Sequence, residues 1–370
     1  LLTYNVQDTR STLLLLEALL ADIAKRPADE QENIRKLHTK LLVPSIIPFA
    51  QMALNGAPLE ESRVAAARDA VRREERELAI RFGQMVGLRW ENALAMANSA
   101  KQTAEYLNRK LNVRIDSTRK DYLDTLKSTA PEVTLIRRIR ETTKLKTSYA
   151  EPWLRLLQRQ GDGRLHSVIR MTGARTGRTS AESEAGATYQ QATRGDLRHW
   201  FVAPEGKMFI MADFQAAEMR CAAWWAGDRR MIEAFRNGED VHSITAAYTK
   251  VSDLAPESFW AQRSDYVITV TRDERQGGKG SGFALVYGVQ ADRLMRHLRT
   301  YGVYVSLEEA ERIREGFFQL YSDFPAWHKE GMRAFERGYT ITPFGSYRRD
   351  IVDDRKAINS PVQSFVSNLT

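Results

Sequence analysis

Cysteine is nearly absent from this sequence of 370 residues, because Cys221 is the only one. A single thiol excludes a disulfide framework and a cysteine-rich zinc site, and it fits a protein of the reducing cytosol. The sequence also lacks any run of about 18 apolar residues, the length that a membrane-spanning helix needs. We therefore expect a cytoplasmic protein without a membrane partner.

An initiator methionine and a signal-peptide pattern are also missing from the start, which reads Leu-Leu-Thr-Tyr. The last residues, 364–370, stop inside an amphipathic pattern. We expect both ends to lie within a longer protein. The length itself favours two or three compact units over a single one.

Acidic residues are outnumbered by basic ones, with 47 Asp plus Glu against 55 Lys plus Arg and a net charge of +8. This balance suits a polyanionic partner such as nucleic acid, but many basic proteins bind none, so the charge alone identifies no function. The apolar share of 43% is enough to build hydrophobic cores.

Helical periodicity dominates residues 9–150. Apolar residues recur at steps of three and four in 11–24 and 41–54, and 62–96 is a long charged amphipathic stretch. Residues 132–146 form a basic helix, which in isolation is better explained as a solvated helix face than as a binding surface.

Strand-like segments appear from about residue 161 on. Residues 164–170 alternate as a strand does, and the apolar run 207–212 predicts a short strand that ends at Asp213. Helices dominate again over 228–338, with Ser306 and Glu309 spaced as a capping box. A hairpin around Gly345 and a helix over 355–370 follow. Helices around a small central sheet predict an α+β fold.

Asp213 is the first candidate for chemistry. A carboxylate at the exit of a buried strand can be held rigidly beside solvent, and Mg²⁺ prefers one or two such carboxylates together with substrate phosphates. The plain alternative is a helix N-cap, because Asp213 also precedes a helical pattern. From this position alone, the cap is favoured.

The wider sequence changes that balance. Residues 213–220 read Asp-Phe-Gln-Ala-Ala-Glu-Met-Arg, which resembles motif A of the family A DNA polymerases, the family of bacterial DNA polymerase I. In that motif the first Asp binds both metal ions, and Glu218 and Arg220 stand at the matching later steps. The family usually has Gln at the third step, where this sequence has Ala216, with Gln215 one place earlier.

Residues 275–288 resemble motif B of the same family. Arg275, Lys279, Phe283 and Tyr287 are spaced by four and so line one face of a helix. Two cations at one end can hold a triphosphate, and two rings further along can contact sugar and base. The alternative is a solvated basic face with two core aromatics, and four glycines make the segment a poor helix by propensity.

Five further segments resemble the family in the same chain order. Three of them are Thr-Gly-Arg-Thr-Ser at 176–180, Asp-Val-His at 240–242 and Arg-x-x-x-Asn-x-Pro-x-Gln at 355–363. Upstream lie patterns that resemble the family's thumb, including residues 144–149. Tyr-x-x-x-Asp at 4–8 resembles the last motif of a proofreading exonuclease. The resemblance therefore spans nearly the whole chain.

The resemblance implies a right-hand polymerase, mostly helical around a small antiparallel palm sheet. It divides the chain into a remnant of a 3′–5′ exonuclease-like domain (1–30), a thumb (31–155), a palm (156–228), fingers (229–350) and the start of a return to the palm (351–370). The family's second catalytic carboxylate lies in a His-Asp-Glu hairpin after this point. Asp353 and Asp354 precede Arg355, so we interpret them as a surface turn.

The implied activity is DNA synthesis on a primer–template, with deoxynucleoside triphosphates and two Mg²⁺ ions, by a protein expected to be a monomer. The resemblance assigns Asp213 and the carbonyl of Phe214 to metal, and Lys279 also to proton donation. The expected nucleotide-binding residues are Arg275, Lys279, His242, Glu218, Phe283 and Tyr287. The expected DNA-binding residues are Arg178, Lys144, Lys146, Arg355, Asn359 and Gln363.

Two other functions compete with this one. A single-subunit RNA polymerase shares the palm, the fingers and the basic helix, but a carboxylate at Glu218 would clash with a ribose 2′-hydroxyl. A non-catalytic DNA-binding protein of the same fold would be favoured by degraded motifs, whereas Asp213 and Lys279 are both present.

Overall fold

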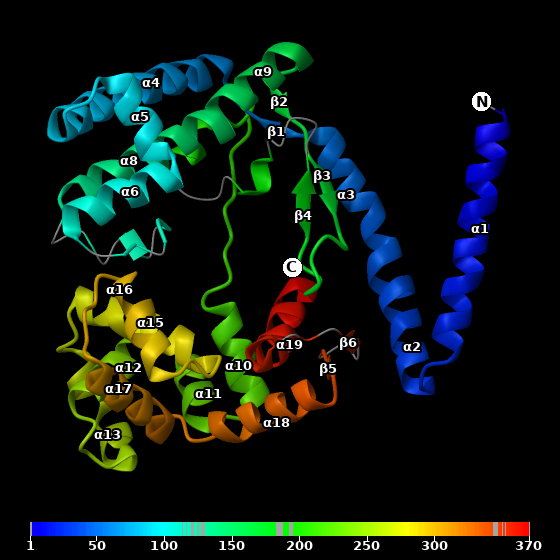
Figure 1. The fold of residues 1–370 in the computed structure, drawn as a ribbon. Coiled ribbons are helices and arrows are strands. Elements are labelled where there is room, and N and C mark those ends of the chain that lie inside the picture. Colours follow the sequence, from blue (N-terminus) through cyan, green and yellow to red (C-terminus); the bar gives the residue numbers. More distant parts are fainter. Residues whose placement is uncertain are drawn as a thin grey trace.

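The computed structural model describes residues 2–112, 114–115, 117–119, 122–123, 126, 130–182, 188–191, 195–342, 347–349, 351 and 353–369. Within them, helices surround three small two-stranded antiparallel sheets (Figure 1). The predicted α+β architecture is therefore confirmed. None of the described helices combines the length and the apolar character that crossing a membrane requires.

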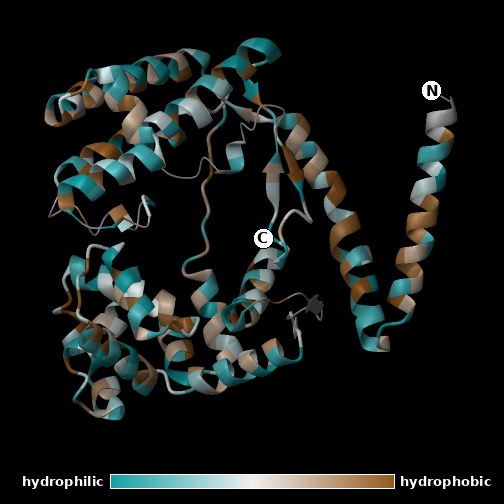
Figure 2. Ribbon diagram, viewed as in Figure 1, coloured by the Kyte–Doolittle hydropathy of each residue, from teal (hydrophilic) through white to brown (hydrophobic). Residues whose placement is uncertain are grey.

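The N-terminal arm consists of two long helices joined at an acute angle (Figure 1). Its elements are α1 (Leu2–Ala24), α2 (Ala28–Lys36), a π-helical turn (Leu37–Leu42) and α3 (Val43–Asn55). The apolar side chains of α1, such as Leu16 and Leu20, are exposed. In Figure 2 stretches of the α1 ribbon carry the brown of hydrophobic residues. Tyr4 and Asp8 of the exonuclease-like pattern lie on α1.

A second group of helices packs on its own core, which includes Phe82, Leu107 and Ile136. It contains α4 (Glu61–Val86), α5 (Trp90–Asn98), α6 (Ala100–Leu111) and α8 (Glu132–Leu145), followed by a π-helical turn (Lys146–Ala150) and α9 (Glu151–Gln160). The predicted stretch 62–96 is divided at Gly87, which ends α4 in the left-handed conformation. Glycine suits that position because it has no Cβ to clash there.

The sheets connect this group to the rest of the molecule. β1 (Ala57–Pro58) pairs with β2 (Arg164–Leu165), and β3 (Val168–Arg170) pairs with β4 (Ser180–Glu182). The predicted strand 164–170 thus exists as two short pieces. Two 3₁₀ turns follow, at Tyr189–Gln191 and Gly195–Trp200. Leu59, Trp153, Leu165 and Trp200 form the core at this junction.

The third group holds the largest core. Its helices are α10 (Ala217–Ala226), α11 (Arg229–Arg236), α12 (Val241–Lys250), α13 (Pro256–Ala261), α14 (Arg263–Val267), α15 (Arg272–Val286), α16 (Ala291–Arg299), α17 (Leu307–Leu320), α18 (Phe324–Glu336) and α19 (Asp354–Leu369). The predicted capping box at Ser306 and Glu309 is confirmed at the start of α17. The predicted hairpin is confirmed as β5 (Tyr339–Ile341) paired with β6 (Tyr347–Arg349), and its tip around Gly345 lies outside the described residues.

Two local predictions are wrong. Residues 207–212 form no strand and are exposed, with Ile210 at 88%. No neighbouring strand pairs with this segment within the described residues, and a strand without a partner leaves its backbone groups unpaired and its apolar side chains uncovered. Asp353 and Asp354 are not a surface turn either. Asp354 begins α19, and the carboxylate of Asp353 accepts a hydrogen bond from the amide of Lys356 at 2.8 Å.

Candidate nucleotide and DNA site

Helix α15 provides the framework of the site. It begins with a capping box in which Thr271 and Glu274 bond each other's backbone amides, a signal that the sequence carries but that we did not use. Glu274 also pairs with Lys250 at 2.8 Å. Arg275, Lys279 and Phe283 follow along the helix, and Tyr287 is its C-cap. The predicted helix is thus present despite its four glycines.

Close packing explains two of those glycines. A Cβ at position 278 would overlap the carbonyl oxygen of His242 and approach Ala246 Cβ to 2.9 Å, and a Cβ at 280 would meet the ring of Tyr301 at 2.8 Å. Only glycine lets α15 approach α12 and α16 this closely. The glycines therefore lower the helix propensity of the segment but allow α15 to pack in the core, where Leu285 and Val286 are fully buried.

The basic end of α15 faces the start of α12. Arg275 donates from Nε and Nη2 to the two carboxylate oxygens of Asp240, at 2.6 and 3.1 Å. Burial works against ionisation of Asp240, but hydrogen bonds from Arg275 and Ser243 outweigh it, so that the pKa of Asp240 is lowered. We did not predict that Arg275 would already have an anionic partner.

His242 lies beside these charges. Burial lowers the pKa of its imidazole, and the Arg275 and Lys279 charges act in the same direction against the opposing effect of Asp240. Its Nδ1 atom is buried and has no hydrogen-bond partner among the described residues. Lys279 is exposed and forms no salt bridge in the described part of the chain. Lys279 is therefore available to an incoming anion, whereas the Nδ1 atom of His242 is unpaired but buried.

Glu218 joins three separate segments at the other end of α15. Its carboxylate pairs with Arg178 from the loop between β3 and β4, and it accepts a hydrogen bond of 3.0 Å from the hydroxyl of Tyr287. Burial and the neighbouring Glu218 charge raise the pKa of Tyr287, so this phenol stays a donor. The ring of Phe283 contacts the ring of Tyr287 edge-on, with the centroids 5.6 Å apart, and is 40% exposed.

A cavity of about 440 Å³ adjoins this cluster. Its lining residues are Thr176, Tyr287, Asp353, Arg355, Lys356, Asn359 and Gln363. Four of them, Arg355, Lys356, Asn359 and Gln363, come from the Arg-x-x-x-Asn-x-Pro-x-Gln segment on α19. The amide oxygen of Asn359 is buried and has no partner among the described residues. The hydroxyl of Ser367 donates to the carbonyl of Gly177 at 2.6 Å, which holds the Arg178 loop against α19.

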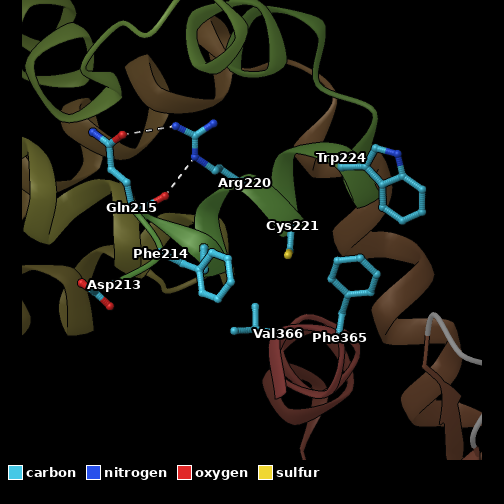
Figure 3. A pocket seen from close by; sticks show the side chains of 9 residues that line it. Asp213, Phe214, Gln215, Arg220, Cys221, Trp224, Phe365 and Val366 are labelled. Atoms are coloured by element: carbon cyan, nitrogen blue, oxygen red, sulfur yellow. Dashed lines mark hydrogen bonds between the residues drawn. The ribbon is translucent and has the colours of Figure 1, made fainter. Parts of the chain in front are cut away.

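Asp213 and Phe214 lie in the exposed segment before α10. With the side chains of Cys221, Phe365 and Val366, they line a mostly apolar pocket of about 530 Å³, and Figure 3 shows Asp213 apart from the apolar side chains. The alternative of a helix cap is wrong, because the N-cap of α10 is Ala216. Among the described residues no three acidic, His or Cys side chains gather as a metal cluster. A single exposed carboxylate still fits Mg²⁺, which is often bound by one or two carboxylates, water and substrate phosphates.

The turn after Asp213 is held by Arg220. Its Nε donates to the carbonyl of Gln215 at 2.9 Å (Figure 3). Its guanidinium also stacks over the ring of Phe235 at 4.5 Å. Ala216 adopts a left-handed backbone with φ of 51°. The residues that depart from the family's motif A pattern are thus the ones that form this turn.

The two lysines of the thumb-like region differ. Lys144 is exposed at the end of α8. Lys146 is mostly buried and pairs with the buried carboxylate of Glu75, which also accepts a 2.7 Å hydrogen bond from Thr143. Lys144 is therefore the better placed of the two to meet a phosphate.

Comparison with known proteins fits this arrangement. The family model "DNA polymerase family A" matches residues 68–369. The chain belongs to DNA polymerase family A.

Curated members of the family are similar over much of the chain. DNA polymerase I of Aquifex aeolicus is 29% identical over 329 residues, which cover 86% of this chain and 52% of that protein. The thermostable DNA polymerase I of Thermus filiformis is 31% identical over 268 residues, covering 68% of this chain and 30% of the relative. The chain thus spans about half the length of the first relative and less of the second.

A solved structure shares the fold. The POL domain of Pol1 from M. smegmatis, in complex with DNA primer–template and dNTP, superposes with a TM-score of 0.75 at 24% identity, over 92% of this chain and 60% of that chain. This likeness confirms the right-hand polymerase fold. The boundaries of thumb, palm and fingers, and the roles of the individual site residues, stay predictions.

Proposed function

We propose that this chain takes part in template-directed DNA synthesis, adding deoxynucleotides to the 3′ end of a primer by two-metal phosphoryl transfer. The observation that carries the proposal is the cluster of Arg178, Glu218 and Tyr287. These residues come from three distant parts of the sequence and from three segments that resemble the family's motifs, and their side chains bond one another. Primer–template DNA and deoxynucleoside triphosphates are the proposed partners.

The triphosphate would lie along the basic end of α15. Lys279 is exposed there, and the remaining Nη1 of Arg275 offers further hydrogen bonds. His242 would lie beside them and contact the phosphates, although its unpaired Nδ1 atom is buried. Fixed charges of this kind neutralise a transferring phosphoryl group without the reorganisation that water would need. Lys279 would also donate a proton to the departing pyrophosphate.

Asp213, with the carbonyl of Phe214, would hold Mg²⁺. When bound, the metal supplies charge neutralisation at the reacting phosphate. The sugar would meet the carboxylate of Glu218, which Arg178 and Tyr287 hold in place, and this carboxylate would exclude a 2′-hydroxyl. Phe283 and Tyr287 would shape the pocket for sugar and base, and Arg355, Asn359 and Gln363 would contact the primer–template through the adjoining cavity.

The direct test replaces the metal ligand. In a full-length enzyme that also carries the family's second catalytic carboxylate, we expect Asp213→Ala to lower primer extension by at least about a thousandfold, or about 4 kcal/mol of barrier, while binding of primer–template changes little. Asp253→Ala is the matched control, because Asp253 is equally exposed but lies between α12 and α13. Extension at the wild-type rate by the Asp213 variant would remove this residue from the site. A full-length wild-type enzyme with both catalytic carboxylates that binds DNA without extending it would favour the non-catalytic alternative.

A second test concerns the DNA surface. Neutralising one phosphate makes the slope of log affinity against log salt steeper by about 0.9. We expect Lys144→Gln to make the slope shallower by about that amount and Lys146→Gln to leave it nearly unchanged, because Lys146 is held by Glu75. Affinity measured at several salt concentrations decides this. Equal slopes for the wild type and Lys144→Gln would take α8 out of the DNA surface.

A further inference from the structure

Arg263, on α14, makes a dense set of contacts that the site described above does not use. Its side chain is only 15% exposed. It donates from Nε and Nη2 to the two carboxylate oxygens of Glu239, at 2.9 and 2.8 Å, and from Nη1 to the carbonyl of Trp260 at 2.7 Å. The guanidinium also stacks on the ring of Trp260 at 4.3 Å. Such a two-point bond fixes the carboxylate in position and direction.

Glu239 directly precedes Asp240, the residue that binds Arg275. The short turn between α11 and α12 is therefore held from two sides by arginines. Arg263 grips Glu239 from α14, and Arg275 grips Asp240 from α15. The amide of Glu239 adds a bond of 2.9 Å to the carbonyl of Ala234. Movement of this turn would carry Asp240, and with it the guanidinium of Arg275.

The bond between Arg275 and Asp240 determines which edge of the guanidinium is available. Nε and Nη2 both point to Asp240, and Nη1 takes part in neither bond. Arg275 is 41% exposed, so this remaining edge can reach a ligand. The N–H groups of a guanidinium that are not bound to a carboxylate can donate to a phosphate oxygen.

We propose that Arg263 is a positioning residue for nucleotide binding. It holds the turn at Glu239 and Asp240, and through Asp240 it keeps Arg275 in the orientation that leaves Nη1 free for a phosphate of the incoming nucleotide. This inference rests on the proposed function, in which Arg275 binds the triphosphate.

The test separates phosphate binding from general stability. Arg263→Ala should raise KM for a deoxynucleoside triphosphate by about tenfold, with kcat within about threefold, as expected when a residue acts through a neighbour. Inorganic tripolyphosphate, which has no sugar or base, should lose inhibitory strength by a similar factor. Arg263→Lys should lie in between, because an ammonium cannot form the two-point bond.

Arg230→Ala is the control. Arg230 also ties α11 to α13, through a 2.6 Å bond to Glu257 and a 2.8 Å bond to the carbonyl of Leu320, but it lies away from the turn at Glu239. Its removal should lower the melting temperature comparably to Arg263→Ala, because both arginines tie helices together. It should leave both nucleotide KM and tripolyphosphate inhibition within about twofold, because the bonds of Arg230 go to Glu257 and Leu320 and not to Glu239 or Asp240.

The outcomes are distinguishable. If Arg275→Ala weakens nucleotide and tripolyphosphate binding but Arg263→Ala does not, the inference is wrong and the proposed function stands. If Arg275→Ala weakens neither, the assignment of Arg275 fails and the inference fails with it. Should Arg263→Ala not fold, Arg263→Glu combined with Glu239→Arg decides. Recovery of wild-type KM supports the positioning role, and a folded double variant with a raised KM overturns it.

Discussion

Helix α15 carries the proposed triphosphate-binding residues, and the segment 207–212 leads to the proposed metal ligand Asp213. The two regions differ in how much of the rest of the protein packs against them. Leu285 of α15 is fully buried in the largest core of the molecule, whereas Ile210 of the segment is 88% exposed. Both stretches are rich in small or apolar residues, and both precede a residue that we assign to the site. Their composition therefore does not determine how firmly each is held.

The difference has a physical origin in the backbone. A helix satisfies its amide and carbonyl groups internally, so α15 needs its neighbours only for side-chain packing. A strand satisfies its backbone only through another strand, which local sequence cannot supply. The segment 207–212 illustrates the second case, because the described residues contain no strand beside it. The backbone hydrogen bonds of a strand before Asp213 would thus have to come from elsewhere in the chain, whereas those of α15 lie within the helix itself.

The sharpest way to test this contrast is to truncate one side chain in each region. In the 370-residue chain, Leu285→Ala should lower the free energy of unfolding by about 2–5 kcal/mol, because it leaves a cavity in a packed core. Ile210→Ala should change it by less than about 0.5 kcal/mol, as at other exposed positions. Urea unfolding of both variants provides the measurement. A large cost at Ile210 would mean that this segment is packed in solution, and the contrast would disappear.

A smaller effect is expected from filling the contact between α15 and α12. Gly278→Ala should destabilise the fold by about 1–3 kcal/mol, because its Cβ would overlap the carbonyl of His242. The neighbouring Gly277→Ala is the matched control, since its nearest atom is Val303 Cγ2 at 3.5 Å. That change should be neutral or stabilise the helix by up to about 1 kcal/mol. If both variants were equally stable, the close approach of the two helices would be wrong.

The same contrast explains how much of the fold could be predicted. Helices α8 and α17 follow from helical periodicity and capping residues, and α15 follows from the four-residue spacing of its motif; all these signals lie within one helix. The ends of the strands could not be predicted from local sequence, because Arg164 and Leu165 pair with residues more than one hundred positions earlier in the chain. The fold class was nevertheless accessible, because helices make up most of the chain.

The residues of the site could be predicted from the sequence better than the contacts between them. The resemblance identified Arg275, Glu218 and Tyr287, and the structure brings the last two together. It could not reveal that Arg275 binds Asp240 or that Lys146 is occupied by Glu75, since both ion pairs join elements far apart in sequence. Asp240 itself belongs to the Asp-Val-His segment that resembles the family, but that segment does not indicate which residue Asp240 would bind.

The smallest predicted effect concerns the turn that leads from Asp213 into α10. Ala216 has a φ of 51°, in the left-handed region that costs a residue with a Cβ about 1 kcal/mol relative to glycine. Ala216→Gly removes this strain but also makes the unfolded chain more flexible, which costs about 0.4–1 kcal/mol. We therefore expect a net change in the free energy of unfolding between about zero and about +0.6 kcal/mol. Ala222→Gly, inside the same helix and fully buried, should instead destabilise by at least about 0.5–1 kcal/mol. Thermal unfolding of the two variants side by side gives the comparison. A loss at position 216 as large as at 222 would mean that Ala216 is helical in solution, and the turn that presents Asp213 would then have a different shape from the one described.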